Sequence, residues 1–493
     1  MHGYTGKKPA RLCACLKMPC PRRLQGNCLS EEFEKQTAEI DETQQQTLRQ
    51  LRSGNVFQLL AHYSIPAVIA TTTASIYNII DRIFIGHGVG AMAIAGLALT
   101  LPMMNMGAAL GSLVGGGGGT LVSIRLGQKR YDEASQIFGN TIFLNLVLGI
   151  GYAIVCSWLL DPLLRLIGAS NATLPYAHEF MQIILLGNVF THLYLGLNNL
   201  TRASGYPRRA MSNTLQTVAV NCVLAPIFIF GLHWGIRGAA LATVLAQFSG
   251  AVVAFPHFLE RESTVRFYLH NMRPRWSAIR GIFSIGISNF VMMFCASITA
   301  MLFNMRMARY GGDYAVGAFG IANTLIMFFV MISFGINQGM QPIAGYNFGA
   351  RQFGRVKEVF RYAVMASSCT MLCGFLLAEV VPGLVVSIFT GDAEMIRQTT
   401  YGLRMIVLLF PLDGLQMTTS VFFQSIGKAR ISLLLALSRQ VIYLIPFLIV
   451  LPLCWGLRGV WLAEPFADTA AFLTTALVLR MQLRSMEKTM AVA

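Results

Sequence analysis

Two stretches of the chain, RLGQKRYDEASQIF at 125–138 and NFGARQFGRVKEVF at 347–360, read as copies of each other when position 125 is aligned with position 347. In both, a glycine, a basic residue, an aromatic residue and a final phenylalanine fall at matching places. Two further motifs recur in the same order, namely SGYPR at 204–208 with IGKAR at 426–430, and WGIRG at 234–238 with WGLRG at 455–459. Three landmarks repeated in order predict a chain made of two homologous halves.

The halves consist mainly of long apolar segments. Of the 493 residues, 55% are hydrophobic and 12% are charged, whereas soluble domains carry about 25% charged residues. This composition argues against a soluble enzyme, a disordered chain and a fibrous protein. A helix needs about 20 apolar residues to cross the hydrocarbon layer of a membrane. The sequence has twelve such runs, at approximately 61–85, 91–121, 136–159, 177–200, 212–231, 238–259, 279–308, 315–343, 360–381, 398–423, 432–454 and 459–480.

These runs are too long and too continuous for the strands of a membrane barrel. The predicted fold is therefore an all-α integral membrane protein with 12 transmembrane helices in two pseudo-symmetric six-helix lobes. Because six is even, both lobes have the same orientation, as in secondary transporters built from parallel repeats. We expect substrate to bind in the cleft between the lobes, near the midplane of the membrane.

The polar segments set the predicted domain boundaries. They give an N-terminal tail at 1–54, an N-lobe with helices 1–6 at 55–260, a linker at 261–278, a C-lobe with helices 7–12 at 279–485 and a C-terminal tail at 486–493. The N-terminal tail mixes many charges with few apolar residues, which predicts a disordered cytosolic segment. It carries four cysteines, Cys13, Cys15, Cys20 and Cys28, whose spacing includes no CxxC pair and so disfavours a zinc knuckle.

Basic residues predict the orientation of the chain. There are 38 Lys and Arg residues against 22 acids, and 29 of the 38 lie in the two tails and in the loops on the same side of the membrane. The positive-inside rule places that side, with both termini, in the cytoplasm of a cell whose plasma (inner) membrane the chain spans. The alternative, a nucleic-acid-binding patch, has no folded soluble domain to carry it.

Motifs of enzymes are absent from the sequence. There is no HExxH, GxSxG or Walker A pattern, and the glycine run at 115–119 lies inside the second span with no lysine after it. Close helix packing or a flexible hinge in the membrane explains this run better than phosphate binding. We therefore expect a protein that is not an enzyme and has no cofactor or metal, and whose transport is driven by an ion gradient.

Acidic residues inside the spans are candidates for coupling, because an ionisable group in the membrane is costly. Five acids lie there, namely Asp81, Glu379, Asp413, Glu464 and Asp468. Asp81 ends the first span, which also contains Pro66 as a candidate hinge. Arg82 could neutralise Asp81, but adjacent helix residues point in different directions. We favour a coupling role for Asp81 over a structural ion pair.

A second group of charges is expected in the C-lobe. Asp413, Glu464 and Asp468 are predicted at similar depths to Arg439, the one clearly deep arginine. An arginine among carboxylates is most simply a structural network, and this interpretation is favoured. The alternative is that one of the excess acids titrates during transport.

The sequence resembles the multidrug and toxic compound extrusion (MATE) family over about 55–485. The resemblance rests on YNIID at 77–81 followed by FIG at 84–86, on QPIAGYNFG at 341–349, on PIFIFG at 226–231, on GIRGAA at 235–240 and on the duplication. It implies two six-helix lobes that export amphiphilic, often cationic drugs in exchange for H⁺ or Na⁺.

The resemblance also implies roles for single residues. Asp81 matches the first-helix acid of an N-lobe cation site, and Pro66 matches the proline at which that helix bends. Asn221 and Thr243 match further residues of the same site, but Ala225 stands where the pattern has a second acid. This departure favours H⁺ over Na⁺ as the coupling ion. Asp413 resembles an acid of a C-lobe site, whose other acid is missing from the seventh span.

Two other functions stay open at this level. One is a flippase for lipid-linked precursors from the same superfamily, which would have a strongly cationic central cavity. The other is a membrane scaffold or receptor that transports nothing. For the favoured exporter we expect a monomer whose partners are small amphiphilic or cationic molecules and the lipid bilayer, and no nucleic acid.

Overall fold

The computed structural model describes residues 49–89, 91–167, 169, 171, 173–260, 263–389 and 392–492. The four cysteines of the predicted tail lie outside these residues. Within the described part, ten helices are long and apolar enough to cross a membrane, and two bent helix pairs raise the number to twelve. The prediction of an all-α chain with twelve spans is therefore confirmed, and every span coincides with a predicted run.

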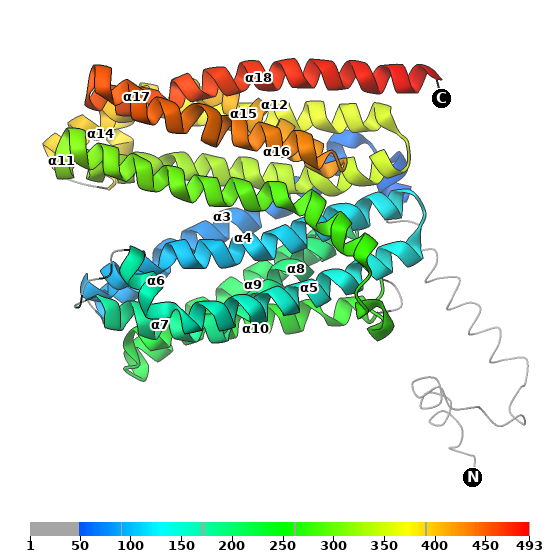
Figure 1. Ribbon diagram of the computed structural model, residues 1–493, viewed down its shortest axis with the longest axis horizontal. Helices are drawn as coiled ribbons and strands as arrows, with labels where there is room; N and C mark the ends of the chain where they lie inside the picture. The colour runs from blue at the N-terminus through cyan, green and yellow to red at the C-terminus, as the bar shows by residue number, and fades with distance from the viewer. Residues whose placement is uncertain are drawn as a thin grey trace, which may run out of the picture. The chain divides into compact units, whose positions relative to one another are not determined.

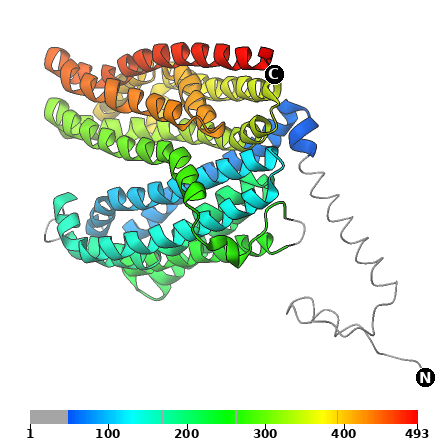
Figure 2. The same cartoon turned by 45° about the vertical axis from the view of Figure 1, so that its right-hand side comes forward.

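The N-lobe forms one bundle of helices, drawn in blue to green in Figures 1 and 2. Its helices are α3 (Val56–Gly88), α4 (Ala91–Gly127), α5 (Tyr131–Trp158), α6 (Leu160–Ile167), α7 (Leu174–Leu186), α8 (Asn188–Ala203), α9 (Pro207–Pro226) with the π-turn η1 (Ile227–Gly231), and α10 (Gly235–Ala254). The short helix α6 was not predicted. A linker with two 3₁₀ turns, η2 (Pro256–Phe258) and η3 (Leu269–Met272), leads to the second lobe.

The C-lobe forms the second bundle, drawn in green to red (Figure 1). Its helices are α11 (Trp276–Gly349), α12 (Phe353–Val380), α13 (Pro382–Ser387), α14 (Ala393–Ile406), α15 (Phe410–Ser425), α16 (Ala429–Leu437), the π-helical η4 (Ser438–Leu444), α17 (Ile445–Trp455) and α18 (Leu457–Val492). Helix α11 contains the seventh and eighth spans, which a break at Gly312 (φ 66°, ψ −163°) separates. Helix α18 continues beyond the predicted end of the last span.

The backbone repeats itself with the sequence. The fourth span bends by 54° between α7 and α8, and the tenth bends by 54° between α14 and α15. Residues with positive φ pair up across the lobes: Lys129 (φ 60°) with Arg351 (φ 59°), Gly205 (φ 105°) with Gly427 (φ 76°), and Gly235 with Gly456 (φ 56° each). The two pseudo-symmetric lobes are thus confirmed, whereas their exact boundaries stay a prediction.

Glycines let the lobes approach each other closely on one side of the predicted membrane. We call this side, where α3 begins and α4 ends, the tail face. A Cβ at Gly127 would clash with the carbonyl oxygen of Tyr346, and a Cβ at the equivalent Gly349 would clash with that of Ile124. Nearby, Ser64 Oγ donates a hydrogen bond to the carbonyl of Ile336 across the lobes, at 3.2 Å. The lobes are therefore closed against each other at the tail face.

The run of five glycines takes part in this packing. All five are buried in α4. A Cβ at Gly117 would clash with the carbonyl of Ile282 in the other lobe, and one at Gly118 would clash with Thr141 of α5. The prediction of close helix packing is confirmed.

The last residues of the predicted tail are ordered, contrary to the expectation of disorder up to residue 54. Residues 49–53 are helical, and Leu51 is buried. Arg355 of the C-lobe donates hydrogen bonds to the carbonyls of Leu51 at 3.3 Å and Gly54 at 2.7 Å. These contacts with backbone carbonyls extend the contact between the lobes at the tail face. The amino-acid composition of the tail does not predict them.

Adding a methyl group at the lobe contact should weaken the fold. At Gly286 of α11, a Cβ would clash with the backbone carbonyl of Leu113 in α4, so Gly286→Ala forces the helices apart. Overpacking of this kind costs about 1–3 kcal/mol. We expect a lower midpoint of thermal unfolding for the purified variant. Gly119→Ala is the control, since its Cβ would meet its nearest atom, the oxygen of Asn199, at 3.4 Å. Equal midpoints for both variants would contradict this prediction.

Candidate functional site

The predicted N-lobe residues lie together inside the bundle. Asp81 occupies the last third of α3, and one turn earlier Tyr77 places its hydroxyl beside both Asp81 and Thr243. Asn221 of α9 donates a hydrogen bond from Nδ2 to Oγ1 of Thr243 in α10, at 3.2 Å. Tyr77 thus connects Asp81 to Thr243, and Thr243 in turn bonds to Asn221. We call these four residues the N-lobe cluster.

Tyr77 was missed as a site residue, although the sequence held a signal for it. It stands at the first position of the YNIID motif and Asp81 at the last, and residues with this spacing lie on the same face of a helix. Ala225, which stands where the family pattern has an acid, is completely buried and offers no oxygen from its methyl side chain. Pro66 lies within α3, several turns before Asp81, and the helix continues through it.

The predicted C-lobe charges also meet. Arg439, in η4, lies 2.9 Å from a carboxylate oxygen of Asp413 in α15, 2.9 Å from one of Asp468 and 3.5 Å from one of Glu464, both in α18. The side chains of Arg439 and Asp468 are 18% and 3% exposed. We call these four residues the C-lobe cluster. Three carboxylates around one guanidinium would carry a net negative charge if all were ionised.

The two clusters overlap at one equivalent position of the duplicated fold. When WGIRG at 234–238 is aligned with WGLRG at 455–459, Glu464 of the C-lobe falls on Thr243, a member of the N-lobe cluster. The same alignment places Asp468 on Gln247, and the alignment of 125 with 347 places Asp413 on Thr191. Thr191 donates a hydrogen bond to the side-chain oxygen of Gln247, so a neutral pair in the N-lobe stands where the C-lobe has two acids. The charged cluster of the C-lobe therefore corresponds mainly to neutral residues in the N-lobe, and Asp81 has no acidic equivalent in the C-lobe.

The fifth predicted acid lies apart from both clusters. Glu379, near the end of α12, forms an ion pair with Arg404 at 3.5 Å, and the two side chains are 33% and 50% exposed. Both line a hollow of about 540 Å³ on the C-lobe, together with Tyr401 and Leu462. An exposed ion pair of this kind is weak, and Glu379 is therefore separate from the coupling candidates.

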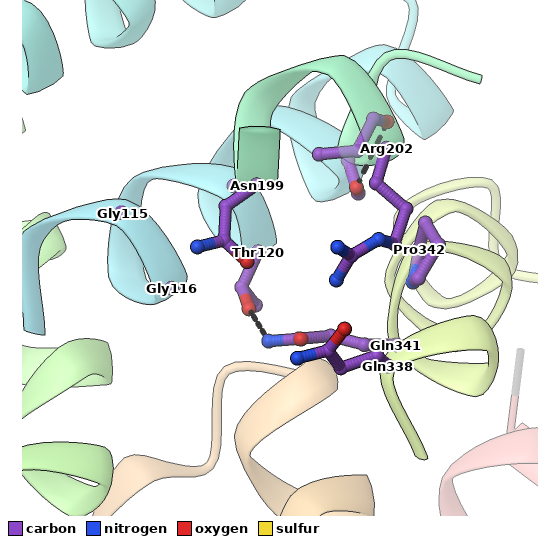
Figure 3. Close-up of a pocket in the computed structure, with 11 residues that line it drawn as sticks. Gly115, Gly116, Thr120, Asn199, Arg202, Gln338, Gln341 and Pro342 are labelled. Carbon is purple, nitrogen blue, oxygen red and sulfur yellow. Dashed lines mark hydrogen bonds between the residues drawn. The ribbon is translucent and has the colours of Figure 1, made fainter. Parts of the chain in front are cut away.

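One buried charge was assigned wrongly from the sequence. Arg202 follows the end of the fourth predicted span at residue 200, which predicts a place in a basic loop, but it lies in the last turn of α8 and is only 9% exposed. Its guanidinium points into a small cavity between the lobes (Figure 3). Hydropathy gave no signal for its burial, because a window of apolar residues ends at the first arginine. Within the described residues, Arg439 is therefore not the only arginine that the helices enclose.

Comparisons with known proteins point to a single family. A family model described as MatE matches the chain twice, at residues 66–227 and at 289–450, once for each lobe. The multidrug export protein MepA of Staphylococcus haemolyticus is 29% identical over 431 residues, which cover 87% of this chain and 95% of that protein. MepA of Staphylococcus aureus is 29% identical over 427 residues, covering 86% and 94%.

Solved structures agree with this match. A structure of the MATE multidrug transporter DinF-BH is 35% identical, with a TM-score of 0.81, and the alignment covers 86% of this chain and 95% of that one. A MATE structure in complex with MaL6 is 25% identical, with a TM-score of 0.84 and coverage of 89% and 99%. The fold is also shared by a transporter of the MOP superfamily from Pyrococcus furiosus. It is 24% identical, with a TM-score of 0.84, and the alignment covers 89% of this chain and 98% of that one.

Proposed function

The chain belongs to the MatE family and is a multidrug efflux transporter, not an enzyme, and on this premise we propose that it exports amphiphilic or cationic compounds in exchange for H⁺. Na⁺ is the alternative coupling ion. The observation that carries the proposal is the N-lobe cluster. It places an acid inside the helix bundle, among a phenol, a hydroxyl and an amide. These neutral groups can orient a carboxylate, and the phenol and the hydroxyl can also pass it a proton.

Asp81 is the proposed coupling residue. When it is ionised, its carboxylate accepts hydrogen bonds from the polar groups around it, and when it is protonated it becomes a donor. This change alters the contacts of α3 with α9 and α10, the helices that carry Asn221 and Thr243. Because α3 also contains Pro66, its two halves can take different relative directions in the two protonation states. That difference couples the proton to the shape of the N-lobe.

The absence of a second acid supports H⁺ over Na⁺. Sodium is a hard cation that is held by several oxygen ligands, and Ala225 contributes no side-chain oxygen. A proton needs a single carboxylate. Asp413 of the C-lobe cluster is the reserve candidate, and a structural role for Glu464, Asp468 and Arg439 is the favoured interpretation.

In the proposed orientation both termini lie in the cytoplasm. The chain spans the plasma membrane of the cell and works as a monomer. The tail face is then the cytoplasmic face, because it carries most of the basic loops. Since the lobes are packed together at that face by Gly127, Gly349 and Ser64, this arrangement is closed towards the cytoplasm. Transport would proceed as the lobes separate at the tail face and close on the other side.

The proposal is tested in efflux-deficient cells that express the protein and are loaded with ethidium, a fluorescent cation. We expect outward transport that stops when a protonophore removes the pH gradient and continues when Na⁺ is replaced by choline. Cells that carry the empty vector are the control. Export that needs Na⁺ and survives the protonophore would replace H⁺ by the alternative ion.

The second candidate function is tested with the same cells. A flippase moves a lipid-linked sugar outward and leaves ethidium inside, so it is distinguished by its substrate. The buried cation Arg202 is the one observation that favours it. The cavity at Arg202 is too small for a lipid headgroup, however, with a volume of about 10 Å³. We therefore rank the flippase below the drug exporter.

A further inference from the structure

Arg202 lies where the two lobes meet. The cavity beside it is lined by Gly115, Gly119, Thr120, Asn199 and Arg202 of the N-lobe and by Gln338 and Gln341 of the C-lobe. In Figure 3 the guanidinium projects between Thr120 and Pro342, with the amides of Gln338 and Gln341 below it. Gln341 closes one side of the cavity, where its amide donates a 2.6 Å hydrogen bond to Thr120 across the lobes.

The charge of Arg202 has no carboxylate partner in the described part of the chain. None of the ion pairs found there includes Arg202, and its one described hydrogen bond is to the Oδ1 atom of Asn198, at 3.2 Å. A guanidinium has five N–H donors. Leaving an arginine buried without a counter-charge is strongly unfavourable.

The end of helix α8 does not supply the missing partner. A helix C-terminus carries a partial negative charge that favours arginine, but here its carbonyl oxygens are already used. Leu200, Thr201 and Arg202 accept hydrogen bonds from the backbone N–H groups of residues 204–206. The carbonyl of Ala203 accepts a bond from Ser123 Oγ, at 3.1 Å. The guanidinium of Arg202 therefore lines the cavity without a second described partner.

From these observations we propose that the cavity binds one small monovalent inorganic anion, of the size of chloride, between Arg202 and the amides of the C-lobe. The anion neutralises the guanidinium and accepts the hydrogen bonds that no protein group takes. The cavity has a volume of about 10 Å³, close to the space of one water molecule, which favours a monatomic anion over sulfate and organic anions. Because its walls come from both lobes, the bound anion stabilises the arrangement that is closed at the tail face.

The duplicated fold provides a variant that should fold without the anion. When SGYPR at 204–208 is aligned with IGKAR at 426–430, Gln424 of the C-lobe falls on Arg202, and Gln424 is 2% exposed. Its amide donates to the carbonyl of Ile285, at 3.4 Å. Arg202→Gln therefore gives the N-lobe the side chain that this position already accommodates in the C-lobe. Arg208→Gln, an exposed arginine on the next helix, is the matched control.

The test measures thermal unfolding of the purified full-length protein in detergent, at constant ionic strength, while sodium gluconate is replaced by sodium chloride or bromide. We expect chloride and bromide to raise the midpoint of the unmodified protein and of Arg208→Gln in a saturable manner. Sulfate should have no such effect. In Arg202→Gln the midpoint should not respond to chloride.

Two outcomes would overturn the proposal. If chloride leaves the midpoint of the unmodified protein unchanged, the cavity holds water only. If Arg202→Gln responds to chloride as strongly as the unmodified protein does, the anion binds elsewhere. Neither outcome bears on the H⁺ coupling of export, which is measured separately by ethidium transport. Bromide at the cavity in an anomalous difference map would confirm the location independently.

Discussion

Asp81→Asn should reduce ethidium export to the level of cells without the protein. Asparagine has nearly the shape of aspartate but cannot take up and release a proton in the cycle, so the pH gradient loses its point of coupling. The cluster partners Tyr77, Asn221 and Thr243 can all hydrogen-bond a neutral amide, so the fold should persist. Export is measured as loss of ethidium fluorescence after energisation, and folding as a monodisperse peak in size-exclusion chromatography.

The control for Asp81 is an equally conservative change in the other lobe. Asp413→Asn removes an acid at a similarly enclosed position, where the side chain is 13% exposed. If Asp81 alone couples, Asp413→Asn retains H⁺-driven export. Unimpaired export by Asp81→Asn, with loss of export by Asp413→Asn, would transfer the coupling role to the C-lobe cluster. Loss in both variants, with normal folding, would indicate that both lobes take part.

The number of helices and the two-lobe architecture could be predicted from the sequence, because both follow from long-range patterns. Twelve apolar runs and three motifs repeated in order indicate the number of helices and the presence of two lobes. The bends after α7 and α14 were not predicted, because a bend within an apolar run leaves hydropathy unchanged. The break at Gly312 fell in the expected loop between the seventh and eighth spans. Local breaks of this kind depend on packing between neighbouring helices.

The residues of the candidate sites could be predicted from the sequence only in part. Charged residues inside apolar runs are rare enough to be noticed, so all four members of the C-lobe cluster were named in advance. Neutral polar residues are not conspicuous in this way: Asn221 and Thr243 are expected only through the family resemblance, Tyr77 only through its spacing from Asp81, and Thr191 and Gln247 emerge from the structure. Arg202 was hidden by its position at the end of a span. Its burial depends on α4 and α11 approaching closely over the glycine run, which no single window of sequence records.

Arg439→Met should lower the midpoint of thermal unfolding more than any other single substitution considered above. This effect on stability is separate from any effect on transport. The substitution leaves Asp413, Glu464 and Asp468 close together without their cation. Removing one partner of a buried charge network costs about 3–5 kcal/mol, because the remaining charges lose their attraction but stay desolvated. The midpoint of thermal unfolding should fall by about 3–5 °C, because the unfolding entropy of a chain of this size is about 1 kcal/mol per kelvin.

Removing the acids together with the arginine separates charge from packing. In Arg439→Met with Asp413→Asn and Asp468→Asn, the cluster resembles the neutral pair that Thr191 and Gln247 form at the equivalent place in the N-lobe. If the cost of Arg439→Met is electrostatic, the triple variant recovers most of the lost midpoint. If the guanidinium serves mainly as a packing element, the triple variant is as unstable as the single one. Recovery of stability together with normal ethidium export would establish the C-lobe cluster as structural and leave Asp81 as the coupling acid.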